Sequence, residues 1–174
     1  WEKSFQSTSV DELCRNAHAK KGSFYHFFSS KTELAIAAIE DAWSQVRLAI
    51  FEPIFNEDNS GLIQIQDLVD TVDSYQGEAA SAKGSYLGCP FGNLGQEMAR
   101  QDEQIRTALQ KIFNEHYDYL EAALNKARRA NEIPAGDNRQ RAKNIFALLE
   151  GGLLLAKVNN DPQTFRNVAR AVLD

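Results

Sequence analysis

The sequence predicts an all-α protein. Its 174 residues include only four prolines and ten glycines, so few positions interrupt a helix. Apolar side chains recur at intervals of three and four residues through nearly the whole chain, which is the spacing of one helix face. Hydrophobic residues make up 43% and charged residues 25% of the chain, as in a globular protein with a substantial core.

Composition also narrows the class of protein. The chain has no apolar run of about 18 residues that would suit a membrane-spanning helix, and no secretory signal is visible. Two cysteines, Cys14 and Cys89, are too few for a disulfide scaffold. These features predict a cytoplasmic protein.

Charge is distributed unevenly along the chain. Residues 1–31 contain five basic and three acidic side chains, a net charge of +2, whereas residues 32–174 carry −7. A total of −5 argues against nucleic-acid binding over the whole surface. A small basic region can still bind DNA locally, because salt screens phosphate attraction beyond about 8–10 Å.

Residues 9–28 predict two short helices joined by a tight turn. Ser9 is a suitable cap for the first helix, and Glu12 lies three residues further on, as in a capping box. The first helix has one apolar face, made of Val10, Leu13, Cys14 and Ala17. In the second helix we expect Phe24, Phe27 and Phe28 on the buried side. The outward side chains are Lys20, Lys21, Ser23, Tyr25 and His26. Cations, a hydroxyl and amphipathic rings suit a helix lying in a DNA major groove.

The same stretch resembles the DNA-binding signature of the TetR family of bacterial repressors. The resemblance rests on Lys21–Phe28 and Ser30–Leu34, and on the approach from Phe5 through Ala17. The remaining chain is similar to the family only in its helical pattern. Two departures are His18 and Ser4, where the family usually has glycine, and at His18 a positive φ is expected. The resemblance also implies a further helix before Trp1.

The resemblance implies a DNA-binding transcriptional regulator with two domains. Residues 1–31 form the helix-turn-helix domain, completed by the start of a helix over 31–55, and residues 32–174 form a helical ligand-binding and dimerisation domain. The partner is a pseudo-palindromic double-stranded operator, from which a small-molecule or electrophile inducer releases a repressor. The expected DNA contacts are Ser9, Lys20, Lys21, Ser23, Tyr25, His26 and Lys31.

The rest of the chain predicts further helices in order. A helix over 31–55 is capped by Ser29 or Ser30, and Pro53 weakens its last turn. A helix from Leu62 to about Gln76 precedes a small polar loop at 77–84, and another begins at Pro90. Long helices follow over 102–131 and 138–158, with caps at Asp102 and at Asp137 or Asn138, before a last helix around Phe165.

The two long helices are the expected homodimer interface. Helix-turn-helix proteins bind two half-sites as two-fold dimers, and the resemblance implies a four-helix bundle from helices 102–131 and 138–158. The second of these is apolar around much of its circumference (Leu148, Leu149, Leu153 and Leu155). Gly151 and Gly152 cost about 1 kcal/mol each relative to alanine, which close approach of another helix would explain. The alternative is a core helix buried within one subunit.

Aromatic side chains in the body suggest a small-molecule pocket. The candidates for ligand binding are Trp43, Tyr86, Cys89, Phe91, Asn93, Met98, Phe113, His116 and Tyr117. For any one of them, packing in the core is the alternative. Cys89, next to Gly88 and Pro90 near a helix start, suggests a redox or electrophile sensor assisted by Lys157 or by Lys83. An inert buried thiol is the alternative.

Catalytic motifs are not found in this sequence. Three histidines, His18, His26 and His116, lack metal-ligand spacing, and no phosphate loop, dinucleotide fingerprint or nucleophile elbow occurs. We therefore predict no metal, no cofactor and no enzymatic activity. The competing hypothesis is a helical small-molecule-binding protein, or an enzyme, whose helix-turn-helix segment does not bind DNA.

Overall fold

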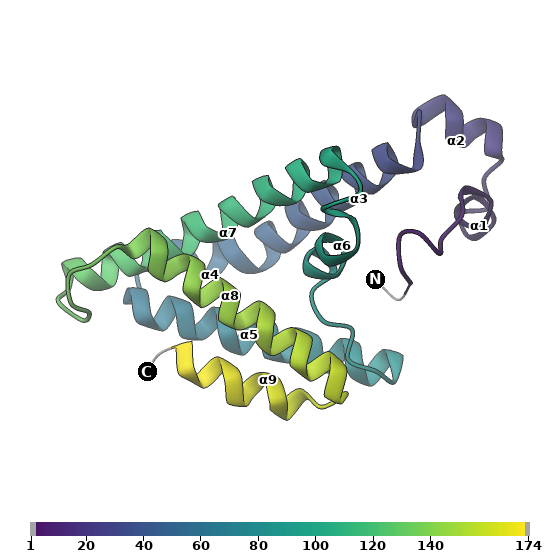
Figure 1. Cartoon of the computed structure of the whole chain (residues 1–174). Helices are drawn as coiled ribbons and strands as arrows, with labels where there is room; N and C mark the ends of the chain where they lie inside the picture. Colours follow the sequence, from purple (N-terminus) through teal and green to yellow (C-terminus); the bar gives the residue numbers. More distant parts are fainter. Residues whose placement is uncertain (1–2, 173–174) are drawn as a thin grey trace. The chain divides into compact units, whose positions relative to one another are not determined.

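A computed structural model describes residues 3–172, and within that range the secondary structure is helical with no strand (Figure 1). The all-α prediction is confirmed. Residues 1–2, at the start of the first predicted domain, and residues 173–174, at the end of the second, lie outside the described range. The helices are α1 (Val10–Asn16), α2 (Lys21–Phe27), α3 (Lys31–Val46), α4 (Glu52–Asn56), α5 (Gly61–Lys83), α6 (Pro90–Met98), α7 (Glu103–Arg129), α8 (Asn138–Asn159) and α9 (Pro162–Ala169). A π-type turn, η1 (Arg47–Phe51), joins α3 to α4, and a 3-10 turn, η2 (Arg170–Val172), follows α9.

The chain divides into two compact units. The first unit combines the described residues up to Ser44 with Pro90–Ile112, and the second combines Gln45–Cys89 with the described residues from Phe113 onward. This spatial division differs from the functional boundary predicted at residue 31, which stays a prediction.

The predicted helix caps are confirmed. Ser9 Oγ accepts a hydrogen bond from the amide of Glu12 at 3.1 Å and so caps α1. Asp102 Oδ1 accepts from the amide of Gln104 at 2.9 Å, at the start of α7. Asp137, rather than Asn138, caps α8 through a 2.9 Å bond from the amide of Gln140. These caps satisfy backbone donors that the first helical turn leaves unpaired.

The helix predicted over 31–55 is continuous but changes pitch before its end. Ser30 Oγ accepts from the amide of Glu33 at 3.1 Å, and the Glu33 carboxylate accepts from the amide of Ser29 at 2.7 Å. The π-type turn η1 lies just before Pro53. Proline has no N–H to offer and its ring crowds the carbonyl four residues back. The wider turn occurs where this conflict arises.

The predicted loop at 77–84 is wrong. Helix α5 continues through Gly77 to Lys83 and ends at Gly84, whose φ of 74° is the left-handed conformation that closes many helices. Three alanines in this stretch are strong helix formers and outweigh the cost of one glycine.

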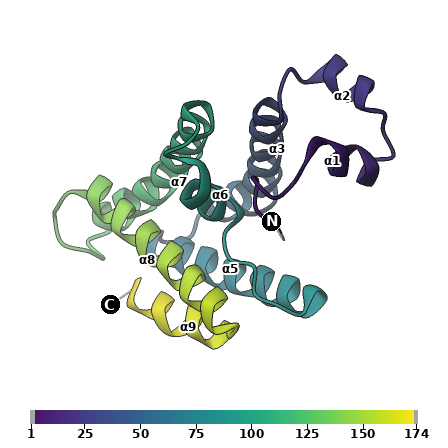
Figure 2. The ribbon, with the colours of Figure 1, turned by 45° about the vertical axis from the view of Figure 1, so that its right-hand side comes forward.

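In the first unit, α1 and α2 form a pair of short helices that leads into α3 (Figure 2). Cys14 on α1 and Phe24 on α2 are buried. Trp43 near the end of α3 meets Phe91 on α6 edge to face, with ring centroids 6.4 Å apart. Buried side chains on α6 and at the start of α7 complete this core: Phe91, Met98, Ile105 and Leu109.

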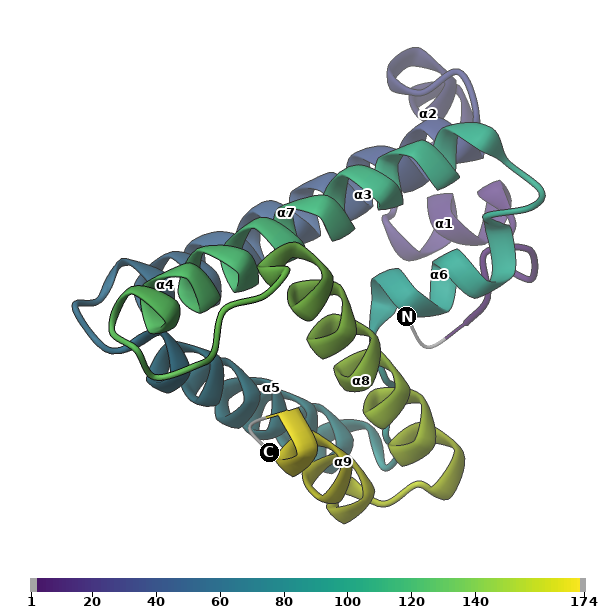
Figure 3. The ribbon, with the colours of Figure 1, turned by 60° about the vertical axis from the view of Figure 1, so that its left-hand side comes forward.

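In the second unit, α9 packs along α8 and α5 (Figure 3). A Cβ placed on Gly152 would lie 3.2 Å from Phe165 and from Val168, so the close approach predicted for this glycine is confirmed. Gly151 has open space beside it instead. The core between these helices contains Val69, Tyr86, Leu149, Leu153, Ala156, Phe165 and Ala169.

A second close approach joins α5 to α7. A Cβ on Gly61 would lie 1.9 Å from the carbonyl oxygen of Ala123, a distance that no side-chain adjustment relieves. The backbones of the two helices therefore meet directly at this point.

Candidate nucleic-acid interface

The turn between α1 and α2 has the backbone conformation predicted for it. His18 has a φ of 51°, and the chain then extends through Lys20 into α2. Histidine tolerates this left-handed conformation better than most residues do. Histidine in place of glycine at this position therefore preserves the helix-turn-helix geometry.

Helix α2 presents polar side chains to solvent. At 100° per residue, His26 lies opposite the side of α2 that carries Phe24 and Phe28, with Ser23 beside it. Ser23 and His26 are exposed, and Tyr25 is 55% exposed at one edge of the same surface. We call the surface formed by Ser23, Tyr25, His26 and Phe27 the α2 face.

The sequence predicts Phe27 on the buried side of the second helix, and this prediction is wrong. Its side chain is 70% exposed and forms the edge of the α2 face opposite Tyr25, with its ring 4.9 Å from that of His26. Phe24 is the buried residue of this seven-residue helix, and Phe28, which follows its last residue, is half-buried. Phe27 is thus a candidate functional residue that sequence reasoning missed.

The predicted cations of this region differ in their surroundings. Lys20 is exposed, whereas Lys21 forms a 2.9 Å ion pair with Asp11 across the two helices. The hydrogen bond and charge of Asp11 raise the pKa of Lys21 above its ordinary value. An exposed pair of this kind contributes little to stability, so Lys21 can exchange its partner for a phosphate at small cost.

Lys31 is engaged within the first unit. Its Nζ donates to the carbonyl oxygens of Phe5 at 2.9 Å and of Thr8 at 3.0 Å. The same ammonium lies 4.2 Å from the centroid of the Phe5 ring. Lys31 therefore ties the start of α3 to the residues that precede α1.

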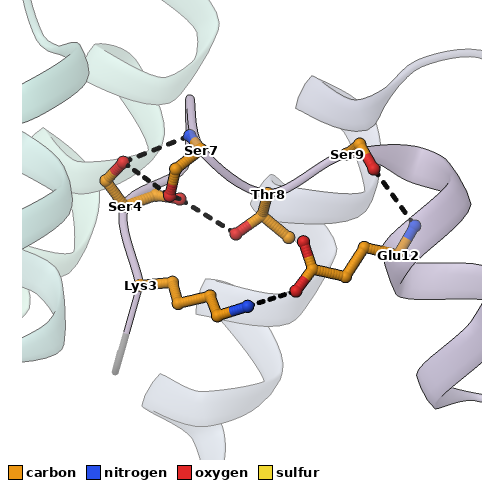
Figure 4. A network of polar contacts seen from close by, with 6 residues as sticks. All are labelled: Lys3, Ser4, Ser7, Thr8, Ser9 and Glu12. Carbon is orange, nitrogen blue, oxygen red and sulfur yellow. Dashed lines mark hydrogen bonds and ion pairs between the residues drawn. The ribbon is translucent and has the colours of Figure 1, made fainter.

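Residues 3–9, which we call the leading segment, form a polar network ahead of α1 (Figure 4). Ser4 accepts from the amide of Ser7 at 3.2 Å, and its carbonyl accepts from the Thr8 hydroxyl at 2.9 Å. Glu12 forms an ion pair with Lys3, whose hydrogen bond is the main cause of the lowered pKa of Glu12. Ser9 is thus occupied as a helix cap inside an ordered segment.

The leading segment is also held by α6. The carboxylate of Glu97 accepts one hydrogen bond from the amide of Phe5 and one from that of Gln6, both at 2.8 Å. These partners lie 92 and 91 residues apart in the sequence. No local pattern in the sequence signals this contact.

The predicted ligand-binding residues fall in both units. In the first unit, Trp43, Phe91 and Met98 are buried, and Asn93 is half-buried. In the second unit, Phe113, His116 and Tyr117 are half-buried and gather around Phe146, with ring centroids 5.0, 5.3 and 5.2 Å from it. Burial raises the pKa of Tyr117.

Tyr86 belongs to the core between α5, α8 and α9, and Cys89 packs against that core. Tyr86 is 2% exposed, and desolvation raises the pKa of its phenol well above the ordinary value. Cys89 is half-buried against that core and hydrogen-bonds the carboxyl group of Glu150, whose pKa is raised by burial. Lys157, the predicted assistant of Cys89, is exposed on α8. Glu150 is a neighbour of the thiol that the sequence analysis did not identify.

The chain matches two models of known protein families. A model described as "Tetracyclin repressor-like, C-terminal domain" matches residues 61–172, and one described as "Bacterial regulatory proteins, tetR family" matches residues 1–38. The chain belongs to the TetR family. It is therefore a DNA-binding transcriptional regulator and not an enzyme.

Individual TetR-family relatives span most of the chain. The transcriptional regulator AcuR of Cereibacter sphaeroides is 27% identical over 170 residues, covering 97% of this chain and 76% of AcuR. The repressor NemR of Escherichia coli K12 is 25% identical over 167 residues, covering 95% and 82%. A crystal structure of a regulatory protein TetR from Rhodobacter sphaeroides superposes with a TM-score of 0.84 at 27% identity, covering 98% of this chain and 89% of that one.

Among residues 3–172, no helix is long and apolar enough to cross a membrane. Over the same residues, no group of three or more histidine, cysteine, aspartate or glutamate side chains is arranged to hold a metal ion.

Proposed function

We propose that this regulator is a repressor that binds a pseudo-palindromic operator through the α2 face and leaves it when an inducer binds. The observation that carries the proposal is the α2 face itself, where Ser23, Tyr25 and His26 are exposed on the second helix of a helix-turn-helix. Lys20 and Lys21 supply cations for phosphates on one side. Such a protein acts where the chromosome lies, in the bacterial cytoplasm.

The DNA contacts we propose divide by role. Ser23 and His26 face the groove floor and can hydrogen-bond base edges. Tyr25, Lys20 and Lys21 lie where they can contact phosphates. Ser9 and Lys31 contribute through the N-terminal turn of α1 and the start of α3, where Lys31 keeps one N–H beyond the two it donates within the first unit.

The partner we propose for α8 is a second copy of the chain. TetR-family regulators bind DNA operators and dimerise. Uncovered apolar side chains form a stripe along α8, with Leu154, Leu155 and Val158 at 40%, 49% and 73% exposure. Gly151 lies in the same stripe with open space beside it. The exposed positions of α7 are nearly all polar, so α8 forms the centre of the proposed interface and α7 at most its rim.

The inducer we propose is a small molecule that contacts the ring group of Phe113, His116 and Tyr117. Half-buried rings with a few polar atoms suit an apolar ligand that carries one polar group. Cys89 and Glu150 support an alternative inducer, an electrophile. The Cys89 sulfur would form a bond to the electrophile while the Glu150 side chain, in its carboxylate form, accepts the thiol proton. Either ligand acts by favouring a conformation that does not fit the operator.

A DNA selection followed by one substitution tests this function. The wild-type protein should select a duplex with two related half-sites from a random double-stranded library. Tyr25→Ala should then weaken binding at fixed salt about tenfold, because a hydrogen bond to a charged phosphate contributes about 1.5 kcal/mol. Tyr75→Ala is the matched control, since it removes another exposed tyrosine outside the helix-turn-helix.

Two outcomes would contradict the proposal. If the wild-type protein selects no duplex, the alternative of a small-molecule-binding protein without DNA readout gains support. If Tyr25→Ala and Tyr75→Ala bind the selected duplex equally well, the α2 face is not the DNA contact.

A further inference from the structure

Both ends of the helix-turn-helix are held by one corner of the first unit. The leading segment enters the motif before α1, and Thr32 follows it at the start of α3. The corner is the segment 97–102, where α6 ends and α7 begins. Its side chains bind the leading segment on one side and Thr32 on the other.

Glu97 makes the contact to the leading segment. Its two carboxylate oxygens each accept one backbone N–H, from Phe5 and from Gln6, both at 2.8 Å. Charge-assisted bonds of this kind are roughly twice as strong as bonds between neutral groups. They fix the backbone of the leading segment directly, and the Ser4 side chain adds a further hydrogen bond to the same carboxylate.

The remaining contacts of the corner reinforce this one. The side chain of Gln101 accepts from the side chain of Gln6 and donates to the carbonyl of Glu97 at 2.7 Å. Asp102 Oδ2 accepts from the hydroxyl of Thr32 at 2.8 Å, while its other oxygen caps α7. Lys31 links the two held ends through the carbonyl oxygens of Phe5 and Thr8.

The charge state of the corner favours these bonds at neutral pH. Burial raises the pKa of Glu97, but the hydrogen bonds from Gln6, Phe5 and Ser4, together with the charge of Lys31, outweigh it, so the pKa is lowered overall. The hydrogen bond from Thr32 is the main cause of the lowered pKa of Asp102. Both carboxyl groups are therefore ionised acceptors.

We propose that Glu97 is a positioning residue for operator binding, because its carboxylate anchors the leading segment and so fixes how α1 and α2 are presented to DNA. The proposal rests on the proposed function. Without the two bonds, the segment that ends in the Ser9 cap of α1 loses its attachment to α6. The α2 face keeps its side chains but is held less firmly.

The test compares Glu97→Gln and Glu97→Ala with Glu103→Gln in the full chain. Glu103 is an exposed carboxylate of the same unit, 82% accessible at its side chain, and it forms an ion pair with Arg106. Two duplexes are used: the one that the wild-type protein selects from a random library, and a second whose half-site spacing is changed by one base pair. A dimer with firmly held reading helices should discriminate strongly between them.

Both Glu97 variants should bind the selected duplex about tenfold more weakly, as loss of a charge-assisted bond predicts. Their discrimination between the two spacings should fall at least about threefold relative to wild type, because a loosened helix-turn-helix adapts to either spacing. Glu103→Gln should match wild type in both measurements. If discrimination is unchanged in the Glu97 variants, the residue supports the fold only and the proposal is overturned.

Hydrogen exchange separates this proposal from the proposed function. The amides of Phe5 and Gln6 should exchange at least about tenfold faster in Glu97→Gln, while amides within α5 keep the wild-type rate. Unchanged exchange at Phe5 and Gln6 overturns the anchoring. A wild-type protein that selects no duplex overturns the proposed function instead, and the exchange rates still decide whether Glu97 holds the leading segment.

Discussion

Phe27 adds an apolar ring to the α2 face, the surface that we propose contacts DNA. Its ring is exposed at the edge of the α2 face, opposite Tyr25. An apolar ring at the edge of a major groove can contact the C5-methyl group of thymine, which is the apolar mark of that base. The surface therefore combines hydrogen-bonding groups at its centre with one hydrophobic edge.

Phe27→Ala should weaken binding of the selected duplex about fivefold, since partial burial of an aromatic ring contributes roughly 1 kcal/mol. Replacing the thymines of each half-site by deoxyuridine, one at a time, removes single methyl groups. One such replacement should weaken binding by wild type but leave Phe27→Ala nearly unaffected. Equal losses for both proteins at every position would show that Phe27 does not contact a thymine methyl group.

At the residue scale, the sequence predicted positions whose signal is local. Ser9, Asp102 and Asp137 were identified as caps because a capping side chain acts within three residues of itself. Phe27 was misplaced because a seven-residue helix does not fix which neighbouring aromatic faces inward. Glu97 could not be found, since its partners lie about ninety residues away along the chain.

At the scale of the elements, α5 contains two glycines in opposite surroundings. Gly61, at its first residue, touches the backbone of α7, whereas nothing lies within 4 Å of a Cβ placed on Gly77. The first glycine is required by a contact between helices. The second glycine lowers the stability of the helix, and no contact with the surrounding structure requires it.

Gly61→Ala should lower the free energy of unfolding by about 3 kcal/mol or more, because the methyl group overlaps a backbone carbonyl. Gly77→Ala should raise it by about 1 kcal/mol through helix propensity alone. Chemical denaturation of both variants checks the pair. Two variants of equal stability would contradict the backbone contact between α5 and α7.

The elements themselves were largely predictable because helical periodicity persists over many residues. The boundaries of α7 and α8 fall within about two residues of those expected, as is usual for helix ends. The sequence places the end of α5 too early, because glycines and small polar residues also favour loops. The alanines of the same stretch favour a helix, and their combined preference is the stronger one. The π-type turn follows from a single proline whose effect on pitch the sequence does not state.

At the scale of the whole molecule, the exposed stripe of α8 is the surface through which we propose that two chains assemble. Leu154, Leu155 and Val158 lie on one side of the helix, and Gly151 adds a position where another backbone can approach closely. A two-fold interface uses the same surface on both copies. Two copies of the α2 face would then meet two half-sites.

Leu155→Glu should convert the proposed dimer to monomer at micromolar concentration. A two-fold interface places the buried charge twice, so the dissociation constant should rise more than about a hundredfold. Leu48→Glu, at a residue of similar exposure on η1, is the matched control and should remain dimeric. Analytical ultracentrifugation decides the outcome, and a monomeric wild type would refute the interface outright.

The π-type turn before Pro53 has a consequence for how relatives align. Each hydrogen bond of such a turn encloses one more residue than in an α-helix, as the bond from the amide of Glu52 to the carbonyl of Arg47 shows. A homologue without the proline can therefore omit a single residue here and still keep its side chains in phase on both sides. Alignments of this segment should therefore place a one-position gap between residues 47 and 51, because the wider turn accommodates the extra residue.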